Sequence, residues 1–270
     1  MRKVFLIIAV VLMVLVALAI AAFFGARSVV SKVVGNGDDS SVFNYSSPSS
    51  YSVGDAEIKD DISSLTINWL SGEVRVEEYE GSRVVIKDEV TEGKISDDLK
   101  LRWKKEGGKV TVQYAAGGIR LNLKGFSKNL VVYVPSSLSL KELKIDGVSA
   151  DGIISLSSLG KLEWDSVNGG MDGVFSRLHE VECDGVNGNI DLTVKERIPM
   201  DMDIDGVNNN VKLTVPSSSS SFTLTHEAIN GDFQSEIPGT MKNKNTFIAG
   251  SGKAEWKVEG VNGDVEIRSI

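Results

Sequence analysis

A turn motif that recurs about every 20 residues constrains the fold of this chain more than any other feature. Segment 184–192 (Asp-Gly-Val-Asn-Gly-Asn-Ile-Asp-Leu) returns in related forms, and each copy is numbered here from its central Asn or Ser. From the second copy on, the central residues are separated by 19, 19, 21, 22 and 32 residues. These central residues are Ser71, Ser149, Asn168, Asn187, Asn208, Asn230 and Asn262.

Apolar residues alternate with other residues on both sides of each centre. Positions −6 and −4 are apolar in almost every copy, which is the period-two pattern of a strand with one buried face. The Asn-Gly centre supplies residues that tolerate turn conformations, and a second strand begins at position +3. A unit of about 20 residues cannot bury its own apolar face, whereas stacked copies bury a continuous core. We therefore predict an all-β, solenoid-like stack, with the central Asn side chains hydrogen-bonded from copy to copy.

Two copies depart from the regular pattern. The Ser149 copy fits the columns least well, and its spacing predicts one extra residue. The interval of 32 residues before Asn262 predicts an insertion over residues 237–245.

The residues before the repeats at 141–270 do not follow the period of about 20 residues. Residues 57–140 hold short β-rich runs separated by turn signals at 80–82 and 106–108, which predict an antiparallel sheet that caps the first repeat. Residues 28–56 are rich in Ser, Gly and Asp and predict a flexible stalk.

An uncharged, apolar run occupies residues 4–24. About 20 apolar residues span a bilayer as a helix, so residues 1–27 predict a retained transmembrane anchor; a cleaved signal peptide is the alternative. The basic residues Arg2 and Lys3 favour an inside N-terminus and an extracytoplasmic C-terminal domain.

Several of these segments together carry a family resemblance. They are the early turn 71–76 (Ser-Gly-Glu-Val-Arg-Val), the strand end Val134-Pro135, and recurrent units such as 261–265 (Val-Asn-Gly-Asp-Val). Over about residues 57–270 the chain resembles the bacterial putative-adhesin, or toastrack-like, family of unknown function. The resemblance implies an all-β, solenoid-like fold, often behind a membrane anchor in the cell envelope, and it implies no catalytic residues.

Charge and cysteine content exclude several functions. The chain has a formal net charge of −8, and residues 1–27 contribute three basic groups and no acidic one, which leaves −11 on the rest. Such an acidic surface argues against nucleic acid or an anionic lipid face as partner. Cys183 is the only cysteine, so there is no internal disulfide and no Cys/His metal spacing, and we predict no cofactor.

Position −3 is the one column that could hold a ligand. Two interpretations of its acidic residues stay open: turn chemistry at a solvated edge, which we prefer, or weak Ca²⁺ sites. The candidates for such an acidic calcium edge are Asp165, Asp184 and Asp205. The full column is Asn68, Asp146, Asp165, Asp184, Asp205, Glu227 and Glu259.

No pattern of an enzyme stands out. The repeated acids are equivalent, whereas glycosidases need two carboxyls in different environments. His226 and Cys183 fall in the apolar −4 column, which indicates packing positions, and His179 has no partner motif.

The sequence thus predicts a non-catalytic, membrane-anchored, extracytoplasmic β-repeat module that binds or scaffolds in the cell envelope. Its partner would be an unknown envelope protein or glycan. The alternatives are an envelope-stress sensor that acts through a membrane partner and, third, a glycan-active β-helix enzyme.

Overall fold

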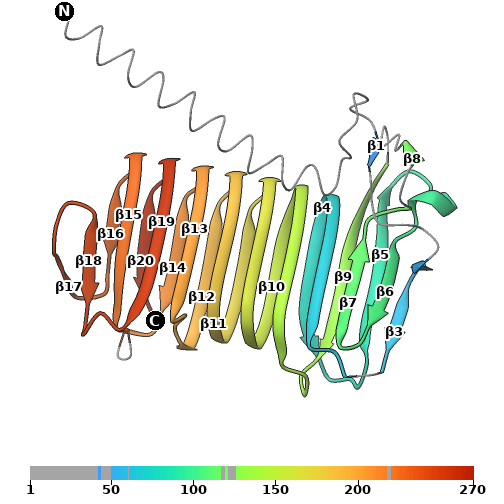
Figure 1. Cartoon of the computed structure of the whole chain (residues 1–270), viewed down its shortest axis with the longest axis horizontal. Coiled ribbons are helices and arrows are strands. Elements are labelled where there is room, and N and C mark those ends of the chain that lie inside the picture. The colour runs from blue at the N-terminus through green and yellow to red at the C-terminus, as the bar shows by residue number, and fades with distance from the viewer. Residues whose placement is uncertain (1–41, 44–49, 60, 117–118, 121–125, 218–219) are drawn as a thin grey trace, which may run out of the picture.

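Most of the chain that the structure describes is β-strand (Figure 1). The structure is a computed structural model that describes residues 42–43, 50–59, 61–116, 119–120, 126–217 and 220–270. Within these residues no helix is long and apolar enough to cross a membrane. The predicted anchor at 1–27 lies outside the described residues, as do residues 28–41 and 44–49 of the predicted stalk. The all-β prediction is confirmed.

Most strands belong to one large mixed sheet of 18 strands, and β1 and β8 form a separate pair. The N-terminal elements are β1 (Val42–Phe43), β2 (Ser52–Val53), β3 (Ala56–Ile58), β4 (Ser64–Tyr79), β5 (Val84–Glu92), the 3-10 helix η2 (Asp97–Leu99), β6 (Arg102–Glu106), β7 (Lys109–Gln113), β8 (Ile119–Arg120) and β9 (Ser127–Pro135). The repeat strands are β10 (Leu140–Asn168), β11 (Met171–Asn187), β12 (Ile190–Arg197), β13 (Asp201–Asn208), β14 (Val211–Val215), β15 (Phe222–Asn230), β16 (Phe233–Ser235), β17 (Gly239–Met241), β18 (Thr246–Ala249), β19 (Ala254–Asn262) and β20 (Val265–Ser269).

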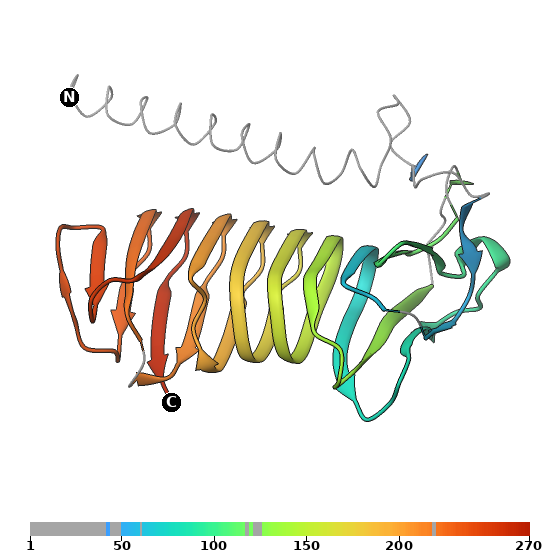
Figure 2. The same cartoon turned by 60° about the horizontal axis from the view of Figure 1, so that its bottom comes forward.

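The repeats form flattened coils that stack side by side along one axis (Figures 1 and 2). Each coil pairs in parallel and in register with the next, so that Asn168 lies opposite Asn187 and Asn187 opposite Asn208. The apolar −6 and −4 positions point inward, as Leu162, Trp164 and Cys183 show by being almost fully buried. The predicted inward alternation is therefore confirmed.

The central asparagines form the predicted ladder. The side-chain amide nitrogen of Asn187 donates to the amide oxygen of Asn168 at 2.8 Å, and that of Asn208 donates to Asn187 at 2.7 Å. Asn262 then donates to Asn208 at 2.8 Å, and Asn230 donates to Asn262 at 2.9 Å. The ladder thus passes from coil to coil in the order 168, 187, 208, 262, 230.

The last two coils are exchanged relative to their order in the chain. Strand β19 pairs with β13 on one side and with β15 on the other, and β20 lies likewise between β14 and β16. The hairpin of β17 and β18 pairs antiparallel with β15, so it covers the outer edge of that strand. The predicted insertion at 237–245 is part of this excursion, and the final strands return to fill the place left between the two coils.

The prediction of an extra residue in the Ser149 copy is wrong. Its register is continuous with both neighbours, since Gly152 lies opposite Val74 in one coil and opposite Met171 in the other. The copy fits the columns poorly for another reason: Gly152 stands where other copies have a large side chain. A Cβ added to Gly152 would lie 2.5 Å from the Trp164 ring, so the indole fills the space of the missing side chain.

The N-terminal region is a mixed cap. The sequence predicts antiparallel pairs in this region. The structure confirms the prediction with three such pairs: β5 with β9, β6 with β7, and β3 with β5. In contrast, β4 pairs in parallel with β7 and β9, so the stack continues one step into the cap.

A fully buried lysine sits inside this cap. The Lys128 ammonium donates to Asp88 Oδ2 at 2.8 Å and to the backbone oxygens of Leu99 and Tyr114 at 2.6 and 2.7 Å. The ammonium also lies 5.0 Å from the ring centre of Trp69 and 4.5 Å from that of Tyr114. One charged group thereby joins β5 and β9 to the segments before β6 and after β7.

Candidate functional site

One outer face of the stack, named the acidic face below, concentrates carboxylates. It consists of the outward positions −7, −5 and −3 of the five consecutive coils built from β10, β11, β13 and β19. Twelve carboxylates and three lysines occupy these positions, which leaves a formal charge of −9 on one face of a chain whose total is −8. The carboxylates are Glu142, Asp146, Glu163, Asp165, Glu180, Glu182, Asp184, Asp201, Asp203, Asp205, Glu255 and Glu259, and the lysines are Lys144, Lys161 and Lys257.

The strand geometry fixes this array. Inward residues alternate with outward ones along each strand, so three side chains per coil point to the same side. Neighbouring coils lie about 4.8 Å apart, which brings equivalent carboxylates of successive coils within reach of one ammonium group.

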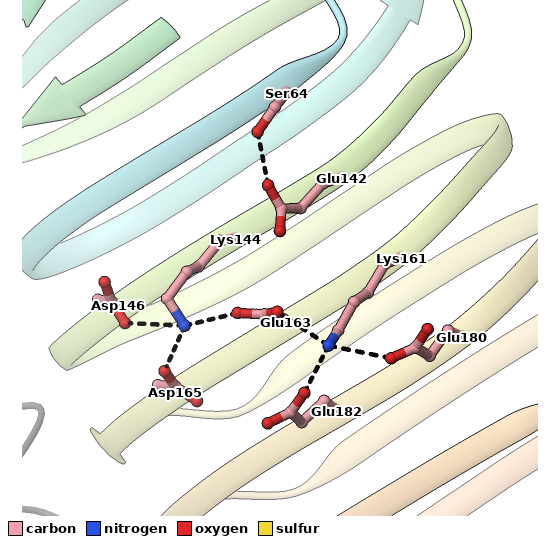
Figure 3. A network of polar contacts seen from close by, with 9 residues as sticks. All are labelled: Ser64, Glu142, Lys144, Asp146, Lys161, Glu163, Asp165, Glu180 and Glu182. Atoms are coloured by element: carbon pink, nitrogen blue, oxygen red, sulfur yellow. Dashed lines mark hydrogen bonds and ion pairs between the residues drawn. The ribbon is translucent and has the colours of Figure 1, made fainter. Parts of the chain in front are cut away.

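Two lysines neutralise one part of the face (Figure 3). The Lys144 ammonium lies 2.7 Å from Glu163, 2.8 Å from Asp165 and 3.5 Å from Asp146. Burial opposes the charged form of Lys144, but hydrogen bonds to Asp165 and Glu163 outweigh it and raise the pKa of this lysine.

Lys161 repeats this arrangement one coil further on. Its ammonium lies 2.6 Å from Glu182, 2.9 Å from Glu180 and 3.0 Å from Glu163, and these bonds raise its pKa, Glu182 contributing most (Figure 3). Burial works against ionisation of Glu163, yet the two lysines together lower the pKa of this carboxyl.

Three carboxylates in the next two coils lack such compensation, although Lys161 pairs with Glu180 and Glu182 and Lys257 lies 3.9 Å from Asp203. Among the described residues, no lysine or arginine forms an ion pair with Asp184, Asp201 or Asp205. Partial desolvation of its carboxyl by the neighbouring side chains, followed by the charges of Asp165 and Asp205, raises the pKa of Asp184 to about 6 although the residue is exposed. Burial and the neighbouring Asp203 also raise the pKa of Asp205. The centre of the acidic face therefore carries uncompensated negative charge, on side chains whose positions are fixed by the strands.

The three calcium candidates lie in one row. Asp165 is opposite Asp184, and Asp184 is opposite Asp205. Asp165 is buried and already bound to the Lys144 ammonium, so only the other two carboxylates remain open. Within the described part of the chain, no group of three or more His, Cys, Asp or Glu side chains is arranged to hold a metal ion.

The repeat motif marks only part of the acidic face. It identifies position −3, whereas positions −7 and −5 emerge only when the period-two alternation is extended by four residues towards the N-terminus. These two columns add the lysines that pair with the acids, and they show that the charge belongs to a whole face.

The histidines and the cysteine lie elsewhere. Cys183 is buried, and burial raises the pKa of its thiol, which keeps it protonated. His226 is half-buried, and burial lowers its pKa. It lines a recess beside Glu259 and Asn209 that has room for about one water molecule. His179 is exposed.

A test of the uncompensated charge is the replacement of Asp184 by Asn. The pKa of Asp184 is raised from 3.8 to about 6, so the folded state binds a proton more tightly than the unfolded state, and stability falls as pH rises through this window. Asp184→Asn should therefore raise the free energy of unfolding at pH 7. We expect on the order of 1 kcal/mol, because Asp184 is exposed and water screens much of the repulsion.

Urea unfolding at pH 7 and at pH 4 measures this effect. The gain should disappear near pH 4, where the wild-type carboxyl is also largely protonated in the folded state. Asp172→Asn, at an exposed position on the opposite face, is the matched control. A variant that is no more stable than wild type at pH 7 would show that the carboxylates do not repel one another.

Known proteins resemble this chain only distantly. No protein-family model matches it, and no curated protein matches it. Among solved structures it is similar to a crystal structure of a putative cell adhesion protein from Clostridium sporogenes, at 13% identity and a TM-score of 0.49, covering 82% of this chain and 100% of that chain. It is also similar to a putative adhesin from Bacteroides fragilis, at 10% identity and a TM-score of 0.32, covering 80% of this chain and 97% of that chain.

These solved structures are described as a putative cell adhesion protein and a putative adhesin, the class that the resemblance in the sequence names. At these identities and TM-scores, the similarity does not indicate what this chain binds.

Proposed function

We propose that this chain is a non-catalytic, adhesin-like β-repeat module whose acidic face binds a basic protein surface in the cell envelope. The observation that supports the proposal is the formal charge of −9 on a single, ordered sheet face. A fixed array of one sign steers and orients a partner of the opposite sign, and it repels nucleic acid and anionic lipid.

The dimensions of the face indicate a weak contact. Five coils at about 4.8 Å spacing extend over roughly 20 Å, and three alternate positions along a strand add roughly 13 Å in the other direction. This area is smaller than the roughly 800 Å² per partner of a standard interface. We therefore expect modest affinity that depends strongly on salt, since exposed charges are screened within about 10 Å at 0.1 M salt.

The internal ion pairs show how an ammonium group can be held. Lys144 and Lys161 each lie between coils and contact three carboxylates. A lysine of the partner would find a similar arrangement between Asp184 and Asp205, which lie opposite each other in adjacent coils and have no ion-pair partner among the described residues.

The membrane anchor is a separate part of the proposal. It rests on the uncharged run at 4–24, which would tether the module outside the cytoplasmic membrane. Cell fractionation with protease added to intact cells or spheroplasts tests this part without reference to the acidic face.

Binding to synthetic polyions tests the acidic face. Poly-lysine should bind the purified chain, poly-glutamate of the same length should not, and the poly-lysine affinity should fall steeply with NaCl. Combined replacement of Asp184, Asp201 and Asp205 by Asn should weaken the binding about tenfold, because three carboxylates without internal partners are lost.

The control variant removes three acids from the opposite face. Glu77→Gln, Asp172→Asn and Asp232→Asn change the net charge equally, and none of these side chains forms an ion pair among the described residues. Equal weakening in both variants would mean that total charge, and not the acidic face, attracts the polycation.

A further inference from the structure

Four central asparagines of the repeats are followed directly by glycine. They are Asn168, Asn187, Asn230 and Asn262, and the pair Asn36-Gly37 lies outside the described residues. A glycine after asparagine leaves the backbone nitrogen unhindered, because there is no side chain to block its approach to the asparagine amide carbon. The same dipeptide therefore occurs at four equivalent places in one fold.

Two hydrogen bonds restrain this dipeptide inside the stack. The asparagine side chain belongs to the ladder described above. The glycine N–H that follows it donates to the backbone oxygen of the central Asn in the next coil outward. These backbone bonds are Gly169 to Asn187 at 3.0 Å, Gly188 to Asn208 at 3.3 Å and Gly263 to Asn230 at 3.0 Å.

The outermost coil lacks this second bond. Because β19 lies between β13 and β15, the coil of β15 and β16 has no coil beyond it (Figure 1). Among the described residues, nothing accepts a hydrogen bond from the Gly231 N–H, and nothing donates to the Asn230 side-chain oxygen. All four asparagines are exposed to solvent, so exposure does not distinguish Asn230, whereas hydrogen bonding does.

We propose that Asn230 is a site of spontaneous deamidation, and that the other three Asn-Gly pairs are protected by the stack. The Gly231 backbone nitrogen attacks the side-chain amide carbon of Asn230 and forms a five-membered cyclic imide. The bond from that carbon to Nδ2 breaks, and the side-chain nitrogen leaves as ammonia with the proton from Gly231. Water then opens the ring at either carbonyl and yields aspartate or isoaspartate.

The product would alter the end of the stack. A carboxylate at position 230 cannot donate to the Asn262 amide oxygen, and it adds negative charge near Asp232 and Asp264, which already lie in adjacent coils. Isoaspartate also inserts one extra carbon into the backbone at the end of β15, in the turn that leads to β16, which must shift β16 against β20. The C-terminal coil would therefore loosen before the rest of the stack.

Peptide mass spectrometry of the aged protein tests this inference. The folded chain is incubated at pH 8, and the conversion of each Asn-Gly peptide from amide to acid is followed over time. We expect Asn230 to convert about tenfold faster or more than Asn168, Asn187 or Asn262, since each hydrogen bond that must first break slows the reaction by up to about tenfold. The peptide with Asn36 is followed separately.

A parallel incubation in denaturant provides the control. There the four rates should agree within a few-fold, which would show that the folded structure and not the flanking sequence creates the difference. Equal rates in the folded chain would overturn the proposal, as would faster conversion at any of the three inner sites. Asn230→Gln should leave the conversion of those inner sites unchanged.

Discussion

Replacing Asp88 by Ala should lower the free energy of unfolding by about 3–5 kcal/mol, because the change leaves the buried Lys128 ammonium without its counter-charge. Lys128 is fully buried, and the Asp88 carboxylate is the only acidic group in hydrogen-bond contact with it among the described residues. The same carboxylate oxygen also accepts the Leu101 N–H at 3.0 Å, so the variant loses a second bond. Urea unfolding at pH 7 measures the loss.

Two variants separate charge from packing. The combined change Lys128→Met with Asp88→Leu removes both charges and should cost much less than Asp88→Ala, since apolar replacement of a whole buried pair is often close to neutral. Asp172→Ala, at an exposed carboxylate of the repeats, should change stability by no more than about 0.5 kcal/mol. If Asp88→Ala proves as mild as this control, the ion pair does not hold the cap together.

The pH dependence follows from the same lysine. Burial lowers the pKa of Lys128 from 10.5 to about 8, although the hydrogen bond to Asp88 opposes this change. Between these values the unfolded state binds more protons than the folded state, so this lysine makes the protein more stable as pH rises from about 8 to 10.5. The rise should be absent in the Lys128→Met variant, and comparison with that variant separates it from the titration of other groups.

The repeat motif made much of this fold predictable. Alternation around residues such as Leu162, Trp164 and Ile190 places side chains inward or outward without knowledge of the partner strand, and the recurring Asn predicts the ladder. These features are local, so a single coil contains the information for them. The order of the last coils depends instead on contacts between distant parts of the chain. The repeat copies centred on Asn230 and Asn262 are equivalent in sequence, so the 32-residue interval between them does not predict which copy pairs with the Asn208 coil.

The buried lysine and the acidic face do not follow from the repeat motif, for different reasons. Lys128 occupies an inward position of β9, in line with Leu130, Val132 and Val134. A charged residue among alternating apolar positions indicates a buried charge, and this indication is present in the sequence. Its partner Asp88 is 40 residues away, and only the pairing of β5 with β9 brings the two together. The acidic face depends on the stacking order of five coils, which turns modest charge on each strand into one continuous array.

The largest effect within the repeats should come from Trp164. Its indole is almost fully buried and occupies the volume that the missing side chain of Gly152 leaves inside the stack. Trp164→Ala should lower the free energy of unfolding by about 3–5 kcal/mol through loss of apolar contact and creation of a cavity. Gly152→Ala should also destabilise, by about 1–3 kcal/mol, because its new Cβ would lie 2.5 Å from the ring.

Combining substitutions at the two positions tests whether they share one space. In a Trp164→Ala background, Gly152→Val should restore part of the lost stability, because the new side chain enters the cavity that the indole vacated. A larger side chain at position 152 should thus lower stability when residue 164 is Trp and raise it when residue 164 is Ala. The difference between the two effects is the coupling free energy of the two sites. Urea unfolding of wild type, both single variants at 152, Trp164→Ala and the combined variant completes the cycle. If Gly152→Val costs the same in both backgrounds, the two residues are independent, and the poor fit of the Ser149 copy to the repeat needs another cause.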